Sequence, residues 1–144
     1  MKTIALRFSD SYAPEEGTIK LHNDIISKNG FVWYGKFGNA VSGKIKKELL
    51  ENESPRFLLI KSGGLDRYWV YFNDIRNEVV DVEHIPEYYR NDSGKVKTWF
   101  KVTKIVKASN DIMSKCHIAS TGQVLSLASK YIMSPYFIIK YEEE

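Results

Sequence analysis

Residue types that could carry out catalysis are sparse in this sequence and lack the spacing that such chemistry requires. The chain has one cysteine and three histidines, which allow neither an internal disulfide nor a structural zinc spacing. Cys116 and His117 are adjacent, and neighbours on a strand point to opposite faces, which argues against a nucleophile–base pair. Asp74 and Asp81 show no paired-carboxylate arrangement. The sequence therefore predicts no catalysis, no metal and no cofactor.

Two other features that resemble catalytic motifs have simpler interpretations. Residues 35–38, GKFG, lack the glycine spacing and the terminal Lys-Ser/Thr of a phosphate-binding loop. Cys116 lies near Ile112 and Ile118, which is typical of a cysteine buried as a small hydrophobic residue. An enzyme that uses Cys116 or His117 is the third hypothesis for function, behind two kinds of binding module.

Aromatic residues are abundant, and several stand beside glycine or lysine. Core packing explains Phe31, Phe57, Phe72 and Phe100. Trp33 and Tyr34 lead directly into Gly35 and Gly38, where a loop is expected rather than a core. The candidates for a binding surface are Trp33, Tyr34, Trp69, Tyr71, Tyr88, Tyr89 and Trp99.

Trp99 has two interpretations that the sequence leaves open. On an alternating strand it shares a face with Lys97 and Lys101, and such a pattern fits a base-stacking surface whose lysines contact phosphates. The same pattern fits a tryptophan that is covered by the C-terminal strand.

The length and composition are those of an ordinary globular protein, and we expect the chain to form one domain over residues 1–144. Of the 144 residues, 43 % are hydrophobic and 27 % charged, a composition that favours a packed core over disorder. No apolar run approaches the roughly 18–20 residues needed to span a bilayer. The apolar run after Met1 is too short for a signal peptide, so we expect a cytoplasmic location and no membrane partner.

The net charge of +3 is mild, but the lysines are unevenly distributed. One group is Lys36, Lys44, Lys46 and Lys47, and the other is Lys95, Lys97, Lys101, Lys104 and Lys107. Such segments can follow the phosphates of a nucleic acid. They can also be solvated side chains that keep a small domain soluble.

A hairpin over Arg56–Ile75 organises the elements that must position these side chains. Residues 56–61 and 67–75 are rich in β-branched and aromatic residues and flank a turn with two glycines. The first run is apolar without alternation, so we expect it to be covered on both faces. In the second, Val70 and Phe72 share one face, and Trp69 and Tyr71 share the other.

The other expected elements are short. Helices are predicted over 19–28, over 43–51 with Ser42 as the cap, and over 123–130. Strands are predicted over 3–8, 96–107 and 136–141, with a short strand running into a loop over 31–39 and a minor strand near Val79–Val82. This order predicts an α+β fold, in which a strongly bent mixed sheet or open β-barrel is surrounded by short helices.

The order of motifs resembles the PUA-like superfamily, and within it the EVE and YTH-like domains that read modified bases. The resemblance runs from Trp33 onward and rests on short stretches. They are an aromatic-Gly strand with a Gly-Asn loop, the strand Phe57–Ser62, the strand Tyr68–Ile75, the Ile-Pro-x-Tyr-Tyr segment at 85–89, the strand at 98–102 and the Ser-Pro before the last strand.

The resemblance implies a cleft in which an aromatic cage accepts a flipped, modified base. The implied cage draws on Trp33 and Tyr34, with Trp69, Tyr71 or Trp99 as further walls, and Ser62 and Asn39 bind the base edge. The resemblance also implies lysines that position the DNA or RNA backbone, namely Lys36, Lys44, Lys61, Lys97 and Lys101. A nuclease or another protein could be the functional partner.

The second hypothesis is a small protein-interaction module, such as an immunity or antitoxin-type protein. It rests on the small size, the modest net charge and the lack of catalytic groups in the sequence.

Overall fold

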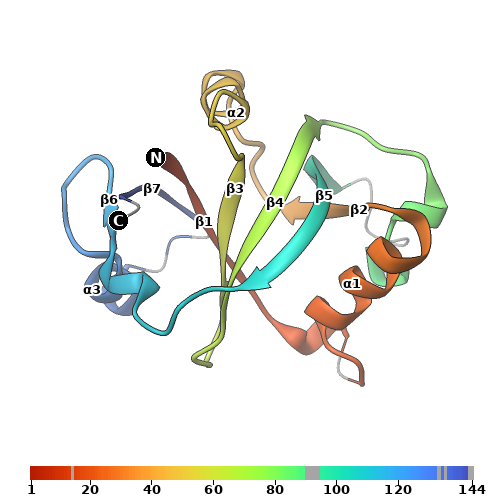
Figure 1. Ribbon diagram of the computed structural model, residues 1–144, viewed down its shortest axis with the longest axis horizontal. Helices are drawn as coiled ribbons and strands as arrows, with labels where there is room; N and C mark the ends of the chain where they lie inside the picture. Colours follow the sequence, from red (N-terminus) through yellow and green to blue (C-terminus); the bar gives the residue numbers. More distant parts are fainter. Residues whose placement is uncertain (14, 90–94, 133, 135, 143–144) are drawn as a thin grey trace.

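The backbone of the protein is built around one open, mixed sheet of seven strands in the order β2-β5-β4-β3-β1-β7-β6 (Figure 1). The computed structural model describes residues 1–13, 15–89, 95–132, 134 and 136–142. The strands are β1 (Lys2–Phe8), β2 (Val32–Phe37), β3 (Arg56–Lys61), β4 (Arg67–Arg76), β5 (Val96–Lys107), β6 (Cys116–Ile118) and β7 (Tyr136–Tyr141). The pairing of β1 with β3 is parallel, and the remaining pairings are antiparallel. The predicted fold class is confirmed.

Three short α-helices surround the sheet, with α1 and α3 at opposite ends of the molecule and α2 at the top of the view (Figure 1). They are α1 (Thr18–Asn29), α2 (Gly43–Leu50) and α3 (Leu125–Tyr131). The cap of α2 is the predicted one, because Ser42 Oγ accepts a hydrogen bond from the Ile45 amide at 3.3 Å. Single 3-10 turns are η1 (Asp10–Tyr12), η2 (Val82–His84), η3 (Glu87–Tyr89) and η5 (Ile112–Ser114).

The predicted hairpin is confirmed as β3 and β4, which pair antiparallel in the middle of the sheet. Val70 and Phe72 of β4 join the core on one face, and Trp69 joins a different cluster on the other. Five of the six residues of β3 are buried, because helices and loops cover both of its faces.

Buried side chains form three clusters that follow from the two faces of the sheet. The first includes Phe57 and Phe100 on the face covered by α1 and α2. The second gathers around Leu58 and Trp69 on the opposite face, where α3 and β7 cover the sheet. The third surrounds Trp99 and lies beneath η3 at the β2 end.

Two stretches differ from the prediction. The expected minor strand near Val79–Val82 is absent from the described structure; instead, Val82 begins η2, and Val79 packs against the third cluster. A short strand that was not predicted, β6, pairs with β7 and forms one edge of the sheet. Three residues are too few for a periodic pattern, so only its partner strand defines it.

Cys116 is fully buried in the second cluster, as its neighbours predicted, and burial raises the pKa of its thiol to about 12. We therefore expect a thiol reagent at about pH 8 to label the folded protein far more slowly than the unfolded protein, because the thiolate is the nucleophile. Labelling followed by mass spectrometry, with and without denaturant, measures the ratio. Equal rates in the two states would contradict the assignment.

None of the helices in the described part of the chain has the length and apolar character that crossing a bilayer requires.

Candidate base-binding cavity

A cavity of about 270 Å³ lies where the end of β1, the open edge of β2, the start of α1 and the turn η3 meet. It brings together Tyr34 and Ser62 of the implied base site with Tyr88 and Tyr89, which were also candidates for a binding surface, and adds further aromatic and hydroxyl groups. Its walls include Phe8, Ser9, Thr18, Tyr34, Gly35, Phe37, Ser62, Tyr88 and Tyr89.

Tyr89 closes the edge of β2 and so shapes the cavity. Gly35 pairs across the sheet with Trp99, and its own amide and carbonyl point to the open edge. The Tyr89 hydroxyl accepts a hydrogen bond from the Gly35 amide at 3.2 Å and donates one to the Gly35 carbonyl at 3.1 Å. A side chain thus satisfies both groups that a further strand would otherwise pair with.

The rings of the aromatic wall are held in place by stacking contacts with one another. Tyr88 stacks on Tyr89 with ring centroids 4.3 Å apart, and Phe37 stacks on Tyr89 at 5.5 Å. Burial raises the pKa of Tyr34 and of Tyr89, so both hydroxyls stay protonated at neutral pH. Rings in these arrangements offer flat apolar surface with hydroxyl groups at the margin.

His22 lies behind this wall and was missed by the sequence reasoning, which tested histidines only for metal spacing. Its ring lies 5.1 Å from Tyr34, 6.2 Å from Tyr88 and 6.1 Å from Tyr89. Nδ1 is 2.7 Å from the Thr18 carbonyl, so this nitrogen carries the proton and donates it. Nε2 is buried and has no hydrogen-bond partner among the described residues. The signal available in the sequence was the helical spacing of Thr18 and His22.

A second cavity of about 230 Å³ adjoins the first, and both are lined by Arg7, Tyr34, Gly35 and Phe37. Lys36 also lines this second cavity and is buried, with 6 % of its surface exposed. Its ammonium group donates to the backbone carbonyl of Asn39 at 2.7 Å. Asn39 itself is exposed and contributes this carbonyl rather than its side chain.

The structure does not bring the other predicted aromatic residues into either cavity. Trp33 is buried in the third cluster, and its indole nitrogen donates to the Asp81 carboxylate at 2.9 Å. Trp69 and Tyr71 lie on β4, where the Arg56 guanidinium is 5.0 Å and 5.5 Å from the two ring centroids.

The two interpretations of Trp99 are decided by its burial. It is 1 % exposed, so it is not an open stacking surface in this structure. Its cover differs from the predicted one, because Tyr89 of η3 packs against it edge-on at 5.2 Å and the C-terminal strand lies elsewhere in the sheet. Trp99 also borders a separate hollow of about 700 Å³ with Lys97 and Lys46.

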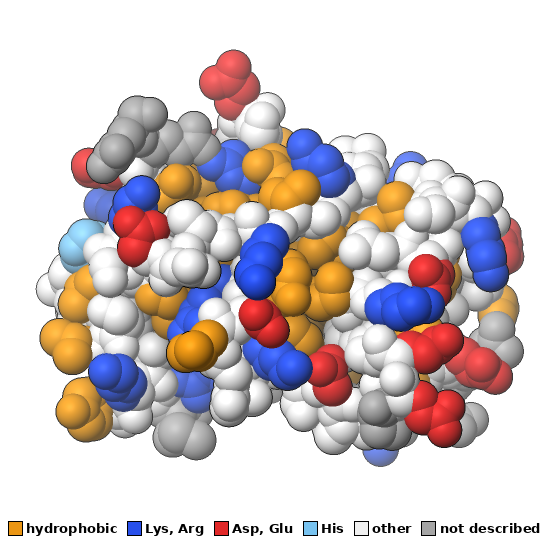
Figure 2. All heavy atoms as spheres, turned by 60° about the horizontal axis from the view of Figure 1, so that its bottom comes forward, with side chains coloured by type: hydrophobic (Ala, Val, Ile, Leu, Met, Phe, Trp, Pro, Cys, Tyr) orange, Lys and Arg blue, Asp and Glu red, His pale blue; other side chains and the backbone are white. Residues whose placement is uncertain are grey.

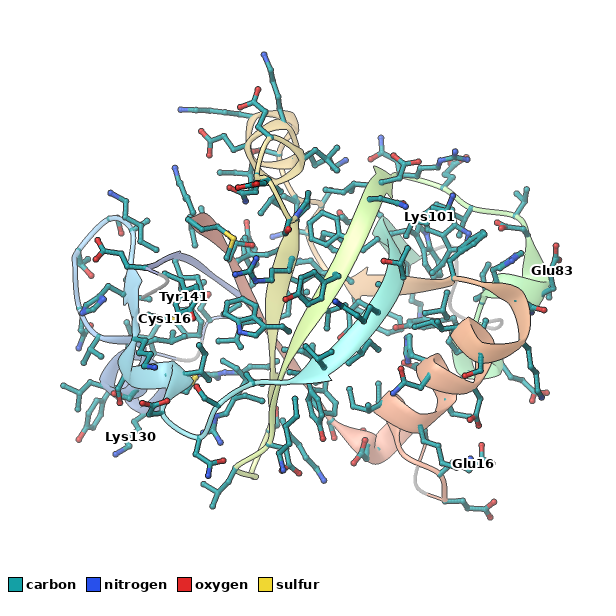
Figure 3. The ribbon with its side chains drawn as sticks, viewed as in Figure 1. Glu16, Glu83, Lys101, Cys116, Lys130 and Tyr141 are labelled. Atoms are coloured by element: carbon teal, nitrogen blue, oxygen red, sulfur yellow. The ribbon has the colours of Figure 1, made fainter. Side chains whose placement is uncertain are left out.

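The predicted lysines other than Lys36 lie in different places. Lys61 forms an ion pair with Asp10 at 3.1 Å, beside Ser62 and the first cavity. Lys101 lies 4.5 Å above the ring centroid of Phe31, on the half of the molecule that carries α1 and away from Cys116 (Figure 3). Lys44 on α2 and Lys97 on β5 are exposed.

Charge on the face shown in Figure 2 is mixed. Lysine and arginine side chains stand among hydrophobic ones over its middle, and acidic side chains gather toward the end that carries α1. Glu16 and Glu83 lie at that end (Figure 3). Among the described residues no group of three or more His, Cys, Asp or Glu side chains could hold a metal ion.

An open mixed sheet with short helices, together with an aromatic cavity at its free edge, defines a small α+β domain. The chain belongs to the Pua-like family, whose model matches residues 4–133. Domains of this type are in general nucleic-acid-binding modules rather than enzymes. No curated protein and no solved structure shows a significant match.

Proposed function

We propose that the protein binds DNA or RNA and takes one flipped, modified base into the cavity beside Tyr34, Tyr88 and Tyr89. The observation that supports this most is an aromatic cavity with hydroxyl groups at its rim, in a chain of the Pua-like family. Extruding a base costs a few kcal/mol, and least when the base is damaged, modified or unpaired. Stacking on aromatic rings contributes about 1–3 kcal/mol per base and can offset that cost.

Ser62 is the side chain best placed to bind the base edge. It follows β3 directly, and its amide donates to the Phe8 carbonyl at 2.8 Å, which fixes the backbone at the cavity rim. Its hydroxyl makes no hydrogen bond with the described residues and can both donate and accept. The neighbouring Lys61, the exposed Lys44 and Lys97, and the half-buried Lys101 are the proposed contacts to the nucleic-acid backbone.

The activity proposed here is recognition, and any cleavage that follows would come from a partner such as a nuclease. This extends the resemblance to EVE and YTH-like readers, with Tyr34 and Ser62 as the residues that the resemblance and the cavity share.

Tyr88→Ala is expected to weaken oligonucleotide binding by about 5- to 100-fold, because it removes one stacking wall. Tyr71→Ala is the matched control, since Tyr71 is half-buried but lies outside the cavity. Fluorescence anisotropy against an array of modified and unmodified DNA and RNA strands measures both. If every strand binds equally well to both variants and to the unaltered protein, the proposed site is wrong.

A further inference from the structure

Arg7 and Lys36 both line the 230 Å³ cavity next to the tyrosines, but the Arg7 guanidinium is directed to the end of α3 and to Phe137, so Lys36 is the residue that brings a positive charge to this cavity. Arg7 lies near the end of β1 and Lys36 in β2, two strands that are not paired with each other. The two cavities have Arg7, Tyr34, Gly35 and Phe37 in common, so a ligand in one lies directly beside a ligand in the other.

Lys36 is buried, and no acidic side chain among the described residues forms an ion pair with it. Its ammonium group donates to the carbonyls of Asn39 at 2.7 Å and Phe37 at 3.3 Å, and lies 4.7 Å from the ring centroid of Tyr136. Burial accordingly lowers the pKa of this lysine. A buried cation costs free energy unless it is paired, so an anion bound beside it would be strongly favoured.

Arg7 is held in place by the end of α3. Its Nη2 atom donates to the carbonyls of Ser129 at 2.7 Å and Ile132 at 3.0 Å, and the guanidinium carbon lies 5.3 Å from the ring centroid of Phe137. These contacts hold the guanidinium on the face of the sheet that α3 covers, whereas Tyr34 belongs to the cluster on the opposite face.

We propose that Lys36 is the cation of an anion subsite that binds the phosphate attached to the nucleoside whose base occupies the tyrosine cavity. The ligand is therefore a nucleotide unit read as base and phosphate together. This rests on the proposed function of the tyrosine cavity. The cavity volumes agree with a ligand that spans both cavities. Each cavity alone, at about 230 and 270 Å³, is smaller than the roughly 300–1,000 Å³ of common ligand sites, whereas the two together fall within that range.

The first test needs no nucleic acid. In protein labelled with ¹³C at lysine Cε, inorganic phosphate is expected to raise the titration midpoint of Lys36 by about 1 pH unit or more, because a nearby anion favours the charged ammonium. The signal of exposed Lys28 is the internal reference and should not respond to phosphate. A Lys36 midpoint that stays constant over the same phosphate series overturns the subsite.

The second test uses an oligonucleotide selected from the array, with a single linkage beside the recognised base replaced by an uncharged methylphosphonate. For the unaltered protein we expect at least about a tenfold loss of affinity at one of the two flanking linkages, because a charge-assisted hydrogen bond is removed. Lys36→Met should bind the charged and uncharged strands with similar affinity, whereas Lys28→Met, at an exposed position in the last turn of α1, should keep the full loss. An equal loss in Lys36→Met and the unaltered protein overturns the proposal.

The two proposals can fail separately. If phosphate shifts Lys36 but no strand binds, the anion subsite holds and base recognition is wrong. If strands bind through Tyr88 and neither flanking methylphosphonate acts through Lys36, base recognition holds and the subsite is wrong.

Discussion

Gly35→Ala is expected to lower the free energy of unfolding by about 1–3 kcal/mol, although it adds a single methyl group. A Cβ atom at Gly35 would lie 2.8 Å from Trp99 Cζ3, 2.9 Å from Val96 Cγ1 and 3.0 Å from Tyr89 Cε1. Trp99 and Tyr89 are each 1 % exposed, so neither ring has free space to move into. Urea denaturation followed by tryptophan fluorescence measures the loss.

The control for this substitution is Gly43→Ala at the first residue of α2. A Cβ atom there has nothing within 4 Å, and the backbone does not have a positive φ. We expect a change within about 0.5 kcal/mol, because alanine favours a helix and restricts the unfolded chain. Equal destabilisation by both substitutions would show that glycine is not required at Gly35 for close packing.

The Gly35 prediction extends to binding, because the Tyr89 ring that must move also forms a wall of the tyrosine cavity. Gly35→Ala protein that remains folded should therefore bind the selected oligonucleotide more weakly than Gly43→Ala. The anisotropy assay used for Tyr88→Ala compares the two.

The folded protein is expected to lose up to about 3 kcal/mol of stability through His22 alone when the pH falls from 7 to 4. Desolvation lowers the pKa of His22 from 6.5 to about 4, only partly opposed by its hydrogen bond to the Thr18 carbonyl. Between these values the unfolded chain binds more protons than the folded protein. The contribution of His22 is therefore fully present above pH 6.5 and is lost as the pH falls toward about 4.

His22→Gln should remove most of this dependence on pH, because a neutral amide replaces the titrating ring. His117→Gln, at an exposed position on β6, should leave it in place. Urea denaturation at a series of pH values gives the unfolding free energies, and the difference between each variant and the unaltered protein isolates its histidine. Parallel curves for His22→Gln and the unaltered protein would contradict the assignment.

The local sequence pattern was enough to predict those elements whose conformation depends mainly on residues close by in the sequence. The hairpin of β3 and β4, the strand β5 and the cap of α2 at Ser42 belong to this group. Their alternation, turn residues and capping hydroxyl act over a few positions in sequence. β6 and the segment around η2 lack such signals, because their conformations depend on contacts with β7 and with the third cluster.

The aromatic residues show why the site was harder to predict than the fold. The sequence identifies Trp33 and Tyr34 as neighbours, but alternation along β2 places them on opposite faces, in the third and the first cluster. Tyr34 reaches the cavity, whereas Trp33 is buried against Asp81. Tyr88 and Tyr89 enter the site through the fold of a loop that has no periodic pattern of its own.

The sequence by itself determined an α+β fold with a central hairpin, the Pua-like resemblance and a wealth of aromatic and lysine side chains available for binding a nucleic acid. Only the tertiary structure decided which of them meet. Four segments supply these side chains, namely β1 with Arg7, α1 with Thr18 and His22, β2 with Lys36, and the end of β3 with Ser62; the tyrosines of η3 come from a fifth. The physical reason is that burial and the absence of a counter-charge depend on what packs against each side chain, and that packing is set by strands and helices far apart in sequence.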